Sequence, residues 1–128
     1  MIDVQETVGP IERVVERLEK AATENQFGVL GVHNLKEKMA AKGVDFACEC
    51  RVVEVCNPHK AKAVLEENMS ISTALPCRIS VYEEGDKVKV ATIRPTMLLS
   101  LFDSPELQGI AREVEDTLIR IIDAACEQ

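Results

Sequence analysis

Apolar residues recur at helical spacing in two long stretches of the chain. In residues 10–23 they fall on one face of a helix, and Pro10 suits the first helical turn. A second stripe follows Ser104 and Pro105, which are predicted to cap and open the last helix, and it continues for about six turns to Ala125. Charged residues occupy the opposite face of this second stretch. Both stretches are therefore predicted to be amphipathic helices that pack on a core.

Five shorter segments are predicted to be strands, because they alternate apolar and polar residues or are rich in β-branched residues. They are residues 2–8, 27–33, 48–56, 77–83 and 87–93. The last two flank Glu84, Gly85 and Asp86 and are predicted to form a hairpin, with Lys87 and Lys89 on its solvated side. In the segment 48–56 each face carries a charge, so the alternation does not indicate which face of the strand points to the core.

Two shorter helices have start signals of their own. Asn34 is predicted to cap residues 35–42, and Gly43 lies near the end of that helix. Asn57 and Pro58 form an N-cap and first-turn pair for another helix. The predicted order of elements is therefore β-α-β-α-β-α-β-β-α.

This order favours an α+β fold. Each predicted helix has one apolar stripe and most strands have one apolar face, which fits a two-layer sandwich: a mixed or antiparallel sheet with helices packed on one face. A chain of 128 residues has the usual size of one domain. Residues 1–128 are therefore expected to form a single domain with one core, and that core must be aliphatic because aromatic residues make up only 3% of the chain.

Charge and composition exclude several classes of partner. Fifteen basic and 22 acidic residues give a net charge of −7, which repels phosphate backbones, so no nucleic-acid partner is expected. The first residues lack the basic and apolar segments of a secretory signal, and no stretch approaches the roughly 18 apolar residues of a membrane span. We therefore expect an acidic cytoplasmic protein without a membrane partner. Its five cysteines are expected to be reduced thiols, metal ligands, reactive groups or packed side chains.

Three short motifs occur in an order that resembles a known family. They are Phe27-Gly-Val-Leu, Cys56-Asn57-Pro58 at the start of a helix, and Leu75-Pro76-Cys77 at the start of the hairpin. In this order and spacing they resemble the family called domain of unknown function 302, and the likeness spans nearly the whole chain. The resemblance implies an α+β fold and no established activity. Where that family often has an acidic residue after the second strand, this chain has His33 and Asn34.

The motif cysteines are the candidates for chemistry. Cys56 directly precedes the N-cap of a helix, where amide groups and the helix dipole favour a thiolate, and Cys77 is its predicted partner if the two strands run antiparallel. Cys56 and His59 also have Cys-x-x-His spacing, a weak signal for a metal site. The alternative is that both thiols are small buried side chains, since free cysteine is among the most buried residue types.

These observations leave three functions open, in the following order. The first is a binding module, in which a small molecule, an anion or a metal lies near Cys56, Asn57, Pro58, His59 and Cys77. The second is a structural domain that self-associates, for example as a homodimer, through an open sheet face or edge. The third is an enzyme that uses the Cys56 thiol in redox or transfer chemistry. The sequence specifies no cofactor, because it has no P-loop and no dinucleotide-binding glycine pattern.

Overall fold

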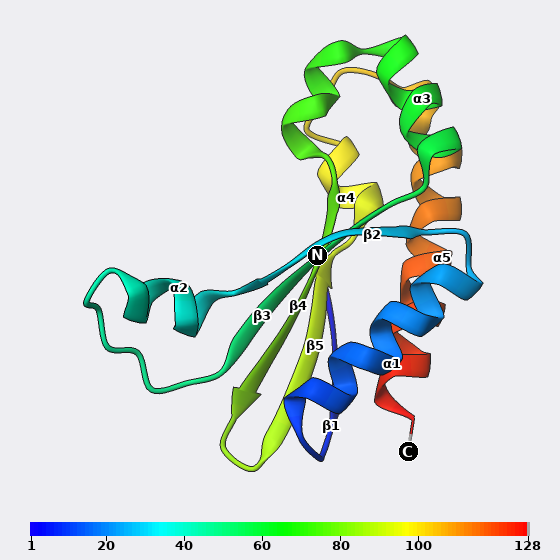
Figure 1. The fold of residues 1–128 in the computed structure, drawn as a ribbon. Helices are drawn as coiled ribbons and strands as arrows, with labels where there is room; N and C mark the ends of the chain where they lie inside the picture. Colours follow the sequence, from blue (N-terminus) through cyan, green and yellow to red (C-terminus); the bar gives the residue numbers. More distant parts are fainter. Residues whose placement is uncertain (128) are drawn as a thin grey trace.

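The five alternating segments form one antiparallel sheet in the order β1-β5-β4-β3-β2, as seen in the computed structural model, which describes residues 1–127 (Figure 1). The strands are β1 (Ile2–Thr7), β2 (Gly28–Asn34), β3 (Cys50–Cys56), β4 (Cys77–Glu84) and β5 (Lys87–Ile93). The predicted hairpin is present: Glu84 pairs with Lys87 across a two-residue turn in which Gly85 has φ +65°. A positive φ is the conformation that glycine adopts without steric cost.

The helices follow the predicted order, with three additional short helical segments. The α-helices are α1 (Ile11–Glu24), α2 (Leu35–Ala41), α3 (Pro58–Glu67), α4 (Pro95–Leu99) and α5 (Gln108–Cys126), and the 3₁₀ helices are η1 (Met69–Ala74) and η2 (Pro105–Leu107). The predicted α+β sandwich is confirmed, and its sheet is antiparallel. In the described part of the chain, no helix is long and apolar enough to cross a membrane.

One main core lies between the sheet and the pair α1 and α5, which pack side by side on the same face (Figure 1). The predicted stripes supply it: Leu18 of α1 and Ile121 of α5 are fully buried, and so are Val81 and Val90 of the hairpin. A second, smaller cluster of buried residues joins α3 and η1 to the start of α5. Its buried members are Val64, Ile71 and Leu107.

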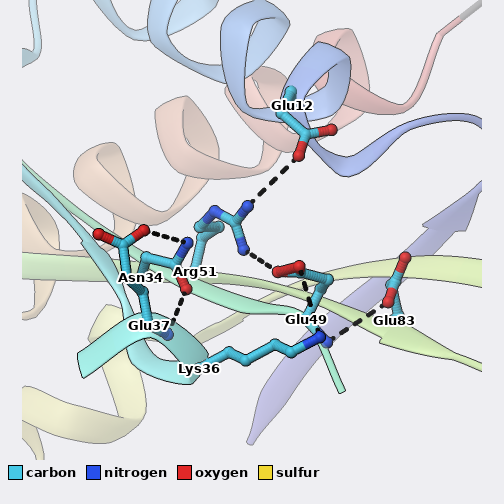
Figure 2. A network of polar contacts seen from close by, with 7 residues as sticks. All are labelled: Glu12, Asn34, Lys36, Glu37, Glu49, Arg51 and Glu83. Carbon is cyan, nitrogen blue, oxygen red and sulfur yellow. Dashed lines mark hydrogen bonds and ion pairs between the residues drawn. The ribbon is translucent and has the colours of Figure 1, made fainter. Parts of the chain in front are cut away.

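Arg51 lies on the inward face of β3. The structure thus shows which face of this strand points to the core, which the alternation in the sequence did not indicate. Val53 and Val55 on the same face are fully buried. The Arg51 side chain is only 11% exposed, and it donates a hydrogen bond of 2.6 Å to Glu49 and forms an ion pair of 3.4 Å with Glu12 in the first turn of α1 (Figure 2). A positive charge at the edge of the core is tolerated because two carboxylates neutralise it.

The segment between β2 and β3 extends away from the helix layer (Figure 1). None of the α2 residues is buried. Asn34 caps α2 as predicted, since its side chain accepts a hydrogen bond of 3.0 Å from the Glu37 amide, and Lys36 lies 3.8 Å from Glu49 at the base of the segment (Figure 2). The polar network around Arg51 therefore connects this segment to the sheet and to α1.

The prediction for the start of the last helix was partly wrong. Ser104 precedes the 3₁₀ turn η2 and makes no side-chain capping bond, while α5 itself begins at Gln108. Ser104 is nevertheless buried. The segments η1 and α4 were not predicted, because each is too short to display a helical repeat.

Glu49 is expected to make the protein acid-sensitive. The hydrogen bond from Arg51 lowers the pKa of the Glu49 carboxyl group below its ordinary value of 4.5. Because the folded-state pKa is the lower one, this stabilisation is present above the unfolded pKa and is lost as pH falls through the folded pKa. We therefore expect Glu49→Gln to cost less than about 1 kcal/mol at neutral pH. Its melting temperature should then fall less than that of the unmodified chain between about pH 6 and about pH 3.

Glu16→Gln is the matched control for this measurement. Glu16 is exposed on α1 and has no ion pair with any residue among 1–127. Its variant should follow the unmodified chain at every pH in calorimetry. Parallel melting curves for Glu49→Gln and the unmodified chain would contradict the expected role of the Arg51 network.

Candidate functional site

The sheet divides at the open end of the β4–β5 hairpin. Backbone pairing between these strands stops at Ser80 and Ala91, although β4 stays paired with β3 as far as Cys77 and β5 stays paired with β1 as far as Ile93. Beyond that point the hydroxyl of Thr92 donates a hydrogen bond of 2.8 Å to the carbonyl of Arg78. The two halves of the sheet therefore separate at this end and are bridged by a side chain.

A pocket of about 440 Å³ lies at this divided end. Its walls come from the ends of β3, β4 and β5, from the N-terminus of β1, and from α3, η1, α4 and α5. Most of the lining side chains are aliphatic, among them Val52, Val64, Leu75, Leu98, Val114 and Leu118. The lining includes Val55 and Cys77 from the inward face of the sheet and Ser80 and Ile93 from the outward face, as expected for a cavity placed where two strands part.

Cys56 and Cys77 both line this pocket. Antiparallel pairing of β3 with β4 brings the two cysteines to the same end of the sheet. This was the condition under which the sequence predicted them to be partners. The residue directly opposite Cys77 is Val55, so Cys56 is one position past the paired site and its backbone position alternates to the other face. The two thiols are neighbours in the pocket wall and do not form a directly opposed cross-strand pair.

Both thiols are held in the neutral form. Burial raises the pKa of the Cys77 thiol to about 11, and the nearby Cys56 adds to this effect. Burial also raises the pKa of Cys56 above its ordinary value of 9.0. The expectation that the helix N-terminus would stabilise a thiolate at Cys56 is therefore not met, because burial of the thiol favours its neutral form.

The amide groups at the start of α3 have partners of their own. The Asn57 side chain accepts hydrogen bonds from the amides of His59 and Lys60 at 3.0 and 3.2 Å, and its backbone carbonyl accepts from the Ala61 amide. Pro58 has no amide hydrogen. The N-cap prediction is thus confirmed, and the amides that were expected to bind an anion donate their hydrogen bonds to the Asn57 side chain.

Two of the predicted site residues lie outside the pocket. Pro58 and His59 are exposed on the first turn of α3 and do not line the pocket, although Asn57 does. Cys48 is exposed. Within residues 1–127 no three histidine, cysteine, aspartate or glutamate side chains lie close enough together to hold a metal ion. The Cys-x-x-His spacing at 56–59 does not extend to a larger ligand set in this part of the chain.

Two cationic residues of the pocket were not singled out from the sequence. Lys60 of α3 and Arg78 of β4 both line it. Lys60 forms an ion pair with Glu113, and Arg78 forms one with Glu54 at 3.6 Å. No local motif marks them, because they become neighbours of one cavity only after α3 and β4 have been placed by the fold. The only sequence signal near Lys60 was the predicted helix start at Asn57, because Lys60 lies in the first turn of that helix.

Fold and site together define an α+β sandwich with a largely aliphatic pocket where its antiparallel sheet divides. The chain belongs to the family Domain of unknown function DUF302, which matches residues 3–125, so the resemblance seen in the motifs is confirmed. It is similar to a crystal structure of an uncharacterized conserved DUF302 protein from Bacillus stearothermophilus, with 34% identity, 98% of each chain covered and a TM-score of 0.92. No curated protein matches the chain.

The raised thiol pKa values lead to an expected order of alkylation. At about pH 7.5, iodoacetamide should modify the exposed Cys48 first, since only the thiolate reacts and burial suppresses it at Cys56 and Cys77. The native Cys77 rate should keep rising toward about pH 11. Peptide mass spectrometry after timed quenching gives the rate for each cysteine, and the same reaction in denaturant should remove the differences. Native Cys77 that reacts as fast as Cys48 would contradict the buried, neutral thiol.

Proposed function

We propose that this chain is a binding domain for a small, largely aliphatic molecule, held in the pocket at the divided end of the sheet. The observation that carries the proposal is the lining of the pocket: about 440 Å³ bounded by aliphatic side chains from many different elements. Ligand pockets of proteins commonly have about 300 to 1,000 Å³ and combine apolar walls with a few polar groups. Burial of the ligand's apolar surface would supply the free energy of binding.

The pocket also contains a few polar groups, which could orient a bound ligand. Asn57, Thr73, Ser80 and Thr92 line it together with the two thiols. The hydroxyl of Thr92 is engaged with a backbone carbonyl, so it contributes to the shape of the pocket. A neutral thiol behaves as a small apolar side chain with a weak donor, which suits a binding wall.

Thiol catalysis is the less favoured function of this site. An attacking thiol needs a sufficient thiolate fraction near neutral pH, whereas burial raises the pKa of both Cys56 and Cys77. The environment of the pocket therefore supports binding over thiol chemistry.

Narrowing the pocket is expected to weaken the binding of a neutral aliphatic probe. Ala61 lines the pocket from α3, and Ala63 on the same helix does not. Ala61→Leu should reduce the affinity for octan-1-ol by at least about tenfold by filling the space that the ligand needs, while Ala63→Leu should leave it nearly unchanged. Amide chemical shifts followed by NMR during titration measure both the affinity and the site.

The amide chemical-shift changes caused by octan-1-ol should centre on the end of β3 and the start of β4. Thermal unfolding of both variants controls for stability, since each substitution adds the same number of atoms to the same helix. Chemical-shift changes that centre elsewhere, or equal affinities of the two variants for octan-1-ol, would contradict the proposed site.

Self-association stays a prediction, and the outward face of the sheet provides an observation in its favour. Ile2, Val4 and Ile93 are exposed there, and cross-strand pairing of Ile2 with Ile93 makes them neighbours on one face. If a homodimer forms through this face, Val4→Glu should dissociate it because a charge would be buried in the interface. Sedimentation velocity over a range of concentrations measures this, and an unmodified chain that remains monomeric throughout would contradict it.

A further inference from the structure

The charged residues in the pocket lining are all of one sign. Lys60 and Arg78 line the pocket, and none of its lining residues is aspartate or glutamate. The whole chain, by contrast, has 22 acidic and 15 basic residues. The pocket is thus a local exception to the acidic character of the protein, and its positive charges would favour a ligand that carries a negative one.

Both cations lie where the pocket meets solvent. The Lys60 side chain is 38% exposed and the Arg78 side chain is 54% exposed, while the aliphatic residue Leu118 deeper in the lining is buried. Long basic side chains commonly pack their methylene groups on apolar surface and keep the charged end in water. This arrangement gives the pocket an apolar interior and a cationic rim.

The cations have carboxylate partners that a ligand could replace. Lys60 is paired with Glu113, whose side chain is 63% exposed, and Arg78 lies 3.6 Å from Glu54. An exposed ion pair such as Lys60–Glu113 contributes little net stability, so an exchange of partners costs little there. Glu54 would keep a partner after such an exchange, because His33 lies 2.9 Å from its other carboxylate oxygen.

We infer that the pocket takes an amphipathic molecule with an aliphatic body and an anionic head group, such as a carboxylate, with the head at Lys60, Arg78 or both. This inference rests on the proposed binding function and adds the chemical class of the ligand. It also assigns the anion to side-chain cations, since the amide groups at the start of α3 are already bonded to Asn57. Guanidinium and ammonium groups bind carboxylates through charge-assisted hydrogen bonds.

Three ligands of equal chain length test the charge preference. Octanoate, octan-1-ol and octylamine share one aliphatic body and differ in the charge of the head group near neutral pH. Octanoate is expected to bind the unmodified chain about tenfold more tightly than octan-1-ol, and octylamine is expected to bind more weakly than octan-1-ol. Isothermal titration calorimetry at low ionic strength, with NMR shifts to confirm the site, provides the affinities.

Charge-neutralising variants test the assignment to particular residues. Lys60→Gln and Arg78→Gln, or the two together, should remove most of the preference for octanoate over octan-1-ol, measured as the ratio of the two affinities in each variant. Lys62→Gln is the matched control, because Lys62 lies on the same helix in an ion pair with Glu66 and does not line the pocket. This control should keep the full preference for octanoate.

The outcomes separate the two proposals. Binding of octan-1-ol with equal or weaker binding of octanoate would overturn the anionic head group and leave the pocket function intact. A preference for octanoate that survives in the double variant would overturn the assignment to Lys60 and Arg78. Failure of all three ligands to bind the unmodified chain would overturn the proposed function itself.

Discussion

The end of backbone pairing between β4 and β5 is the constraint on which the site depends. As long as two strands share hydrogen bonds their backbones lie about 4.8 Å apart and no cavity fits between them. Beyond Ser80 and Ala91 that constraint is absent, because each strand follows its outer neighbour. The space that opens is closed by α3, η1, α4 and α5, and it becomes a pocket with walls from both faces of the sheet. The small second core around Ile71 holds these covering segments together.

The same enclosure decides the chemistry of the thiols. A cysteine beside a helix N-terminus is often a reactive thiolate, and Cys56 has that position in the sequence. Two features of the fold oppose a thiolate here: Asn57 accepts the hydrogen bonds of the first free amides of α3, and burial in the pocket wall raises the pKa of both thiols. Desolvation then favours the uncharged form. Asn57 thus stabilises the helix and at the same time removes the donors that an anion or a thiolate would need.

Local patterns predicted most of the fold and about half of the site. The stripes of α1 and α5, the hairpin with Gly85 in its turn, and the caps Asn34 and Asn57 all follow from short-range rules that the structure obeys. The inward face of β3 was not predictable, because one of the two carboxylates that neutralise Arg51, Glu12, lies 39 positions away in the sequence. Likewise Cys56 and Cys77 belong to recognisable motifs, whereas Lys60 and Arg78 enter the site only through the packing of α3 against the divided sheet.

The charges that line the pocket differ in sign from the net charge of the chain. An acidic chain repels anions at long range, but screening by salt limits that repulsion to about 10 Å at moderate ionic strength. Within the pocket the nearest charges dominate, and these are Lys60 and Arg78. Their carboxylate partners, Glu113 and Glu54, do not line the pocket. In the free protein each cation is therefore neutralised from outside the cavity, and the proposed anionic ligand would replace these carboxylates without leaving a buried charge unpaired.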